Sequence, residues 1–170
     1  MIARRQWLMA GVGATAALAG MGGALWWETR GVVDPAFWAL VFKRPDGGDL
    51  ALAAFRGKPL LLNFWATWCP PCVREMPALD RFAQAHRDKG WQVVGLAVDA
   101  VAPVREFLQR APVSYPVGLA GLDGARLSRD LGNDSGGLPF TAAFDAEGRL
   151  VDRHLGEATA ADLERMGRHF

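Results

Sequence analysis

Residues 60–72 read LLLNFWATWCPPC. The first six, residues 60–65, form an apolar run of strand length, which indicates a central strand buried on both faces. Apolar residues then recur at helical spacing from Cys72 to Ala83, which predicts a helix that follows the cysteines directly. Cys69 and Cys72 are the only two cysteines in the chain of 170 residues. This count excludes a scaffold held by several disulfides and a four-cysteine metal site.

The cysteines lie where the predicted strand gives way to the predicted helix. The first turn of a helix has unpaired N–H groups and a partial positive charge, which favour the thiolate, the reactive form of cysteine. Pro70 and Pro71 fit this turn because a missing N–H costs little there. We therefore predict an exposed Cys69 that attacks a substrate disulfide, and a Cys72 beneath it that resolves the mixed disulfide. Run backwards, the same steps would oxidise a substrate.

Other uses of the two cysteines fit the sequence less well. A disulfide across two residues closes too small a loop to stabilise a fold. The three histidines are not paired at zinc-ligand spacing, and Val73 stands where haem attachment needs a histidine. A peroxidase that uses Cys69 alone stays open, because Thr67 precedes it closely. We expect no metal and no cofactor other than the redox-active Cys69–Cys72 pair.

The rest of the chain alternates strands and helices. Strands are expected at residues 37–42, 50–52, 91–98, 115–119, 139–144 and 149–155, and helices at residues 104–110, 127–131 and after a capping box at Thr159 and Asp162. A turn at residues 45–48 joins the first two strands into a hairpin. This order predicts an α/β domain with a mixed central sheet flanked by helices.

The N-terminal region has the pattern of an export segment. Arg4 and Arg5 precede an uncharged run from Trp7 to Trp27, and this start resembles a twin-arginine signal. Cleavage near residues 17–19 would release a soluble domain, whereas retention would give an anchor about 30 Å long. Either route places the domain on the periplasmic side of a bacterial inner membrane, and length favours the anchor. We expect a signal or anchor at 1–27, a tether at 28–36 and a domain at 37–170.

The charge of the chain also excludes a class of partner. Nineteen Lys and Arg residues balance eighteen Asp and Glu residues, for a formal net charge of +1. A nucleic-acid surface needs a strong basic excess, so we expect no nucleic-acid partner.

Residues 63–72, NFWATWCPPC, resemble the active-site segment of the thioredoxin superfamily, and more narrowly that of TlpA/ResA-like extracytoplasmic thiol–disulfide reductases. The likeness covers residues 37–170 and includes residues 136–141 and 144–149. It implies a thioredoxin-like fold with an extra N-terminal β-hairpin. It also implies a cis peptide bond before Pro139, facing the cysteines, beside which the Leu138 backbone would pair with an extended substrate. The expected substrate contacts are Trp68, Pro70, Pro71, Leu138 and Phe140.

Two positions in this resemblance bear on proton transfer. Asn63 lies where the family has a buried aspartate, and an amide cannot accept the proton that the aspartate relays. Glu75 matches an acidic residue of the ResA-like branch, which implies a base for Cys72 or a charge that raises thiol pKa values. The alternative for Glu75 is a favourable acidic residue in the first turn of a helix.

The resemblance implies a protein-disulfide reductase that acts on exported proteins. Apocytochrome c is one possible client, in cytochrome c maturation, and a membrane thiol-transfer protein is the implied electron donor. Three alternatives remain at this point: a disulfide-donating oxidase, a copper metallochaperone that uses Cys69 and Cys72, and a non-catalytic assembly factor.

Overall fold

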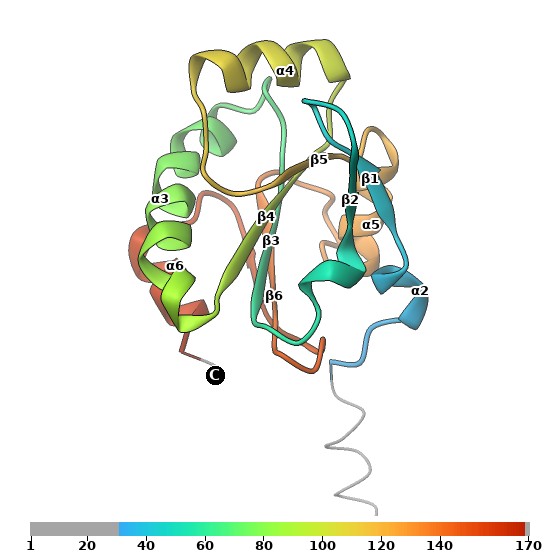
Figure 1. The fold of residues 1–170 in the computed structure, drawn as a ribbon, viewed down its shortest axis with the longest axis vertical. Coiled ribbons are helices and arrows are strands. Elements are labelled where there is room, and N and C mark those ends of the chain that lie inside the picture. Colours follow the sequence, from blue (N-terminus) through green and yellow to red (C-terminus); the bar gives the residue numbers. More distant parts are fainter. Residues whose placement is uncertain (1–30, 169–170) are drawn as a thin grey trace, which may run out of the picture. The chain divides into compact units, whose positions relative to one another are not determined.

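The structure is a computed structural model that describes residues 31–168 (Figure 1). A compact unit begins at Val33. The expected signal or anchor at 1–27 lies outside the described residues, so the division into signal, tether and domain stays a prediction. Within residues 31–168, no helix is both long enough and apolar enough to span a bilayer.

One mixed sheet of seven strands forms the centre of the unit, in the order β2-β1-β5-β4-β3-β6-β7. The strands are β1 (Val41–Lys43), β2 (Asp49–Ala51), β3 (Leu60–Trp65), β4 (Gln92–Ala97), β5 (Val117–Leu119), β6 (Phe140–Phe144) and β7 (Leu150–Leu155). Strands β3, β4 and β5 are parallel, and the other neighbouring pairs are antiparallel. The predicted mixed sheet and the N-terminal hairpin, β1–β2, are confirmed.

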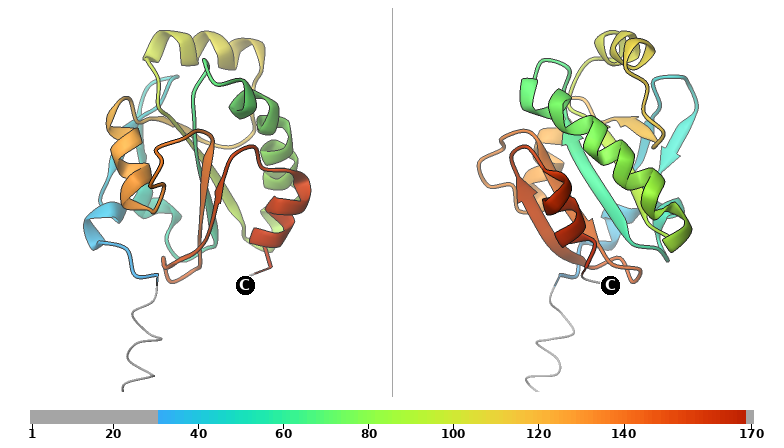
Figure 2. Two further views of the ribbon diagram at one scale, coloured as in Figure 1. Left: turned by 180° about the vertical axis from the view of Figure 1, so that it is seen from behind. Right: turned by 90° about the vertical axis from the view of Figure 1, so that its left-hand side faces the viewer.

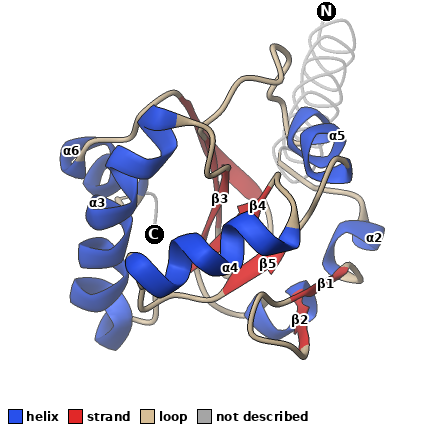
Figure 3. Cartoon of the chain, turned by 90° about the horizontal axis from the view of Figure 1, so that it is seen from above, coloured by secondary structure: helices blue, strands red, loops and turns tan. Residues whose placement is uncertain are grey.

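Helices cover both faces of this sheet, as Figures 2 and 3 show. They are α2 (Pro35–Trp38), α3 (Pro70–His86), α4 (Val101–Arg110), α5 (Asp123–Asp130) and α6 (Ala160–Met166). Helices α3 and α6 pack on one face, with Leu61 and Trp65 of β3 in their core, and the buried residues of α2 pack on the other. The predicted capping box of α6 is confirmed.

Strand β3 has the predicted bounds, and all six of its residues are buried. Its alternating side chains enter the two cores in turn: Leu60, Leu62 and Phe64 on one face, Leu61 and Trp65 on the other. A strand covered on both faces is apolar at successive positions, which explains why Asn63 is its single polar residue.

The strand predicted at residues 37–42 is wrong at its start, because residues 35–38 form helix α2. The Asp34 side chain caps this helix by accepting the Ala36 N–H, and Pro35 takes the first position, where proline is favoured. Phe37 then stacks on Phe144, with ring centroids 5.2 Å apart. A single helical turn that buries Phe37 therefore stands where the strand was expected to begin.

The helix predicted at residues 127–131 begins earlier, at Asp123. Gly124 resembles a turn residue in the sequence, but in α5 it is buried. A Cβ on Gly124 would lie 3.0 Å from Val98 Cγ2, so the missing side chain lets α5 approach the end of β4 closely. The start of α5 lies near Cys69.

Candidate active site

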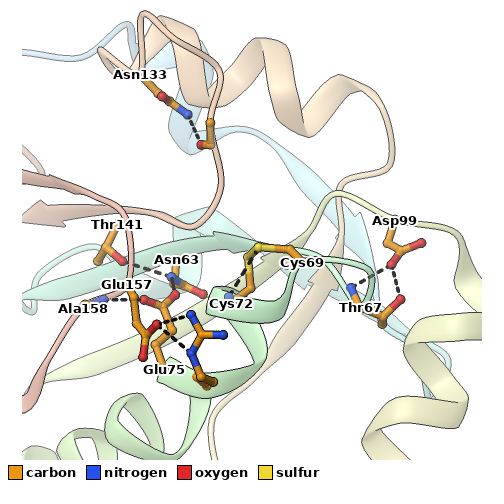
Figure 4. The surroundings of a disulfide bond; sticks show 12 residues. Asn63, Thr67, Cys69, Cys72, Glu75, Asp99, Asn133, Thr141, Glu157 and Ala158 are labelled. Carbon is orange, nitrogen blue, oxygen red and sulfur yellow. Dashed lines mark hydrogen bonds and ion pairs between the residues drawn. A yellow bond between two sulfur atoms is a disulfide. The ribbon is translucent and has the colours of Figure 1, made fainter.

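The two cysteines form a disulfide at the N-terminus of α3, with an S–S distance of 2.09 Å (Figure 4). Cys69 is the N-cap residue, and its Sγ accepts the Cys72 N–H at 3.4 Å. Pro70 and Pro71 begin the helix, as predicted. The pair therefore lies at the positive end of the helix dipole, which favours a thiolate at Cys69 after reduction.

The exposure of the cysteines follows the predicted order but not the predicted degree. Cys69 is 5% exposed and Cys72 is fully buried. The expectation of an exposed Cys69 is therefore wrong. Cys69 instead lines a cleft of about 820 Å³, and Cys72 is not part of the lining. Cys69 is therefore the cysteine that a substrate sulfur in this cleft would meet.

Four segments of the chain build the cleft. Its lining comprises Trp68, Pro70 and Pro71 beside Cys69, residues 98–100 after β4, Gly121, Leu122 and Ala125 at the start of α5, and residues 136–138. Four of the five expected substrate contacts lie here. The fifth, Phe140, is a wrong prediction: it is buried opposite Phe64 in the β3–β6 register, with ring centroids 6.0 Å apart.

The Leu138–Pro139 peptide bond is cis, which confirms the expectation. The pairing of β6 with β3 begins only at Phe140, so Leu138 lies just outside the sheet ladder and inside the cleft lining. This position places Leu138 in the same cleft as Cys69.

A buried asparagine that the sequence did not single out shapes the loop before this proline. Asn133 Nδ2 donates to the Gly137 carbonyl at 2.8 Å and to Ser128 Oγ at 3.2 Å. Its Oδ1 accepts the Ser135 hydroxyl at 3.2 Å. One side chain thus ties α5 to the residues that lead into the cis bond. In the sequence, Asn133 resembles one more turn residue among glycines.

We expect Asn133→Ala to lower the free energy of unfolding by about 2 kcal/mol, because the Gly137 carbonyl loses its side-chain donor. Chemical denaturation of the oxidised protein measures this change. Asp134→Ala is the matched control, since Asp134 is exposed in the same loop and its loss is expected to cost less than about 0.5 kcal/mol. Equal effects of the two substitutions would contradict the role of Asn133.

Asp99, at the end of β4, fastens the segment between β3 and Cys69. Its Oδ2 accepts both the Thr67 N–H, at 2.9 Å, and the Thr67 hydroxyl, at 2.5 Å. Its Oδ1 accepts the Ala100 N–H at 2.7 Å. The Thr67 hydroxyl, which a peroxidase would direct at Cys69, is therefore engaged by Asp99. No local pattern in the sequence indicates this bond, because it joins residues far apart in the chain.

Glu75 is a buried carboxyl, only 1% exposed, one helical turn after Cys72 on the same face of α3. Its Oε1 accepts Asn63 Nδ2 at 2.7 Å and its Oε2 accepts the Ala158 N–H at 2.8 Å. Burial raises the pKa of Glu75 to about 7, against the lowering effect of these two hydrogen bonds. The alternative of a favourable acidic residue in the first turn is wrong, because α3 begins at Pro70 and has no acidic residue in its first turn.

Asn63 completes this buried group. Its Nδ2 also donates to Thr141 Oγ1 at 3.0 Å, while its Oδ1 has no hydrogen-bond partner in the described chain. Asn63 therefore orients Glu75 from β3, and Glu75 is the titratable group. Among residues 31–168 no cluster of three or more His, Cys, Asp or Glu side chains has the geometry of a metal site.

Comparison with known proteins agrees with this geometry. Residues 34–167 match the Redoxin family. The thiol-disulfide oxidoreductase ResA of Bacillus cereus is 31% identical over 121 residues, which cover 70% of this chain and 67% of that protein. The thioredoxin-like protein YneN of Bacillus subtilis (strain 168) is 33% identical over 132 residues, 72% of this chain and 71% of that protein.

A solved structure shares both fold and sequence with the chain. The structure of MTB DsbF, in mixed oxidised and reduced forms, is 31% identical and superposes with a TM-score of 0.66. The match covers 79% of this chain and 96% of that one. The chain thus belongs to the Redoxin family and is a thiol–disulfide oxidoreductase of the ResA type, with a thioredoxin-like fold and the pair Cys69–Cys72.

Proposed function

We propose that this oxidoreductase works as a reductase of disulfides in exported proteins. The observation that carries the direction is the buried Glu75 on the face of α3 that holds Cys72. A pair whose thiolate form is strongly stabilised is a good oxidant, because its reduced state is favoured. A carboxylate beside Cys72 opposes the thiolate and raises thiol pKa values, which leaves the reduced pair a better electron donor.

The reaction begins with the reduced pair. The Cys69 thiolate attacks one sulfur of the client disulfide, and the other client sulfur leaves as a thiolate. Cys72 then gives its proton to the Glu75 carboxylate and attacks Cys69 Sγ, which releases the second client sulfur. The client gains two electrons and the pair loses two. A base with a pKa of about 7 suits this proton transfer at neutral pH.

The proposed place of action is the periplasmic side of a bacterial inner membrane. Export is supported by Arg4-Arg5 and by the uncharged run from Trp7 to Trp27. We propose a twin-arginine route, after which the segment either stays as an anchor or is cleaved. That compartment is oxidising, so the pair needs an electron donor, for which we propose a membrane thiol-transfer protein. Apocytochrome c is a proposed client, because its cysteines must be free before haem attachment.

We expect a reduction potential for the Cys69–Cys72 pair near that of thioredoxin, about −270 mV. Equilibration with defined ratios of reduced and oxidised dithiothreitol, followed by thiol counting, measures it. A value near about −120 mV, typical of a disulfide donor, would make the protein an oxidase. A second measurement adds copper to the reduced protein. Stoichiometric copper binding without disulfide exchange would instead identify a metallochaperone.

A further inference from the structure

Two large apolar side chains stand in solvent at the cleft that Cys69 lines. Trp68 is 65% exposed and Leu122 is 93% exposed, and both belong to the lining. Leu122 follows Gly121, whose φ of +55° turns the chain into α5, and it holds the N-cap position of that helix. A leucine this exposed adds nothing to the core. Single exposed apolar residues are common, but two beside a reactive group mark a contact surface.

The charge of the cleft restricts what it can hold. Asp99 is the one charged residue among the described residues of the lining, and each of its carboxylate oxygens already accepts hydrogen bonds from Thr67 or Ala100. The rest of the lining is apolar or glycine. A client segment in the cleft is therefore bound more tightly when it carries apolar side chains, because no charged side chain is free to pair with it. The segment must also bring a sulfur to Cys69.

The position of Leu138 indicates which side chains of a bound client segment face the cleft. Leu138 lies in the lining, just outside the ladder of β6, where a client segment can pair with it in an extended conformation. Side chains of an extended segment alternate, so residues two positions from the client cysteine point to the same side as its sulfur. Those residues face the cleft, whereas the adjacent residues face away.

From these contacts we propose that the cleft selects extended client segments with a large apolar side chain two positions from the attacked cysteine, and that Leu122 determines this specificity. The proposal rests on disulfide reduction by Cys69. It adds a sequence preference to that reaction, and Leu122 acts as a binding residue that touches the client.

Peptide disulfides with 2-nitro-5-thiobenzoate provide the test. One peptide has leucine at both positions two residues from its cysteine, and its isomer has leucine at both adjacent positions, with serine elsewhere. The reduced protein attacks the peptide sulfur and releases the coloured thiobenzoate, which is the better leaving group, and Cys72 then releases the peptide thiol. With the reduced protein as the only electron donor, we expect the second-order rate constant of thiobenzoate release to be about 10-fold higher for the first peptide, as burial of part of a leucine side chain predicts.

Variants of the full chain assign the preference to a residue. Leu122→Ser is expected to bring the ratio of the two second-order rate constants close to one, and Leu122→Met to restore it. Val41→Ser is the matched control, because Val41 is 56% exposed but does not line the cleft, and its ratio is expected to match the parent. The internal ratio is independent of how much active protein each preparation contains.

The outcomes separate this proposal from the proposed function. If the parent protein reduces neither peptide nor the symmetric nitrobenzoate disulfide, the reductase activity itself is wrong. If it reduces both peptides equally, or if the preference survives Leu122→Ser, disulfide reduction stands and the specificity proposal is overturned.

Discussion

Cys72→Ser is expected to convert this oxidoreductase into a covalent trap for its clients. Cys69 still lines the cleft and still attacks a client disulfide, but no thiol remains to resolve the adduct. The chain has no third cysteine that could substitute. We expect multiple turnover to fall by at least about 10³-fold, since release then depends on external thiol. One client chain per protein should appear on a non-reducing gel and disappear with dithiothreitol.

Cys69→Ser is the matched control for this trap. Cys72 is fully buried and outside the cleft, so the control should form no adduct although it also keeps one cysteine. The reverse result, an adduct with Cys69→Ser alone, would exchange the roles of the two cysteines. Cellular function that persists in Cys69→Ser would favour the non-catalytic assembly factor over an enzyme.

The parts of the fold that were predicted correctly depend on local pattern. Strand β3 lies between Pro59 and the cysteine motif, and its burial on both faces requires apolar residues at every position but Asn63. The capping box of α6 is likewise contained in four consecutive residues. The errors arise where packing decides: α2 forms because Phe37 meets Phe144, and α5 extends because Gly124 fits against Val98.

The residues of the site also separate into those predictable from local sequence and those that depend on contacts between distant segments. The cysteines were predictable because the spacing of consecutive residues determines their chemistry, and the cis proline because residues 136–141 resemble the family. Asp99 and Asn133 were not, because each acts through bonds to a different segment. Phe140, an expected substrate contact, follows Pro139 directly in the sequence. The register that pairs it with Phe64 turns its side chain into the core instead.

Glu75→Gln has the second large expected effect, on stability as a function of pH. The pKa of Glu75 rises from 4.5 in the unfolded chain to about 7 in the oxidised fold, mainly through burial. The folded state therefore binds the extra proton more tightly, so the contribution of Glu75 to stability is most favourable below pH 4.5 and is lost as pH rises through about 7. The shift corresponds to a loss of up to about 3 kcal/mol at alkaline pH.

The glutamine variant should fold because its neighbours can satisfy the new side chain. The Oε1 of the introduced glutamine would keep the Ala158 N–H, and a rotated Asn63 amide would turn its unpartnered Oδ1 towards the new N–H group and the Thr141 hydroxyl. A neutral side chain has no proton to lose between pH 4.5 and 7. We therefore expect the variant to match the parent near pH 4.5 and to exceed it above pH 7 by about 3 kcal/mol, or about 10 °C in Tm.

Glu157→Gln is the matched control for the pH step. Glu157 pairs with Arg74 at 2.7 Å near the same helix, but its side chain is 40% exposed. Loss of this surface pair should cost less than about 1 kcal/mol. The variant should keep the fall in stability between pH 4.5 and 7, because burial is the largest cause of the raised Glu75 pKa and the Glu157 charge is the smallest. If the free energies of unfolding of the parent and of Glu75→Gln change in parallel from pH 4.5 to 8, Glu75 does not titrate in this range. In that case the pH profile of disulfide reduction would also be the same in the two proteins. Another group with a pKa near neutrality would then have to accept the proton that Cys72 loses when it attacks Cys69.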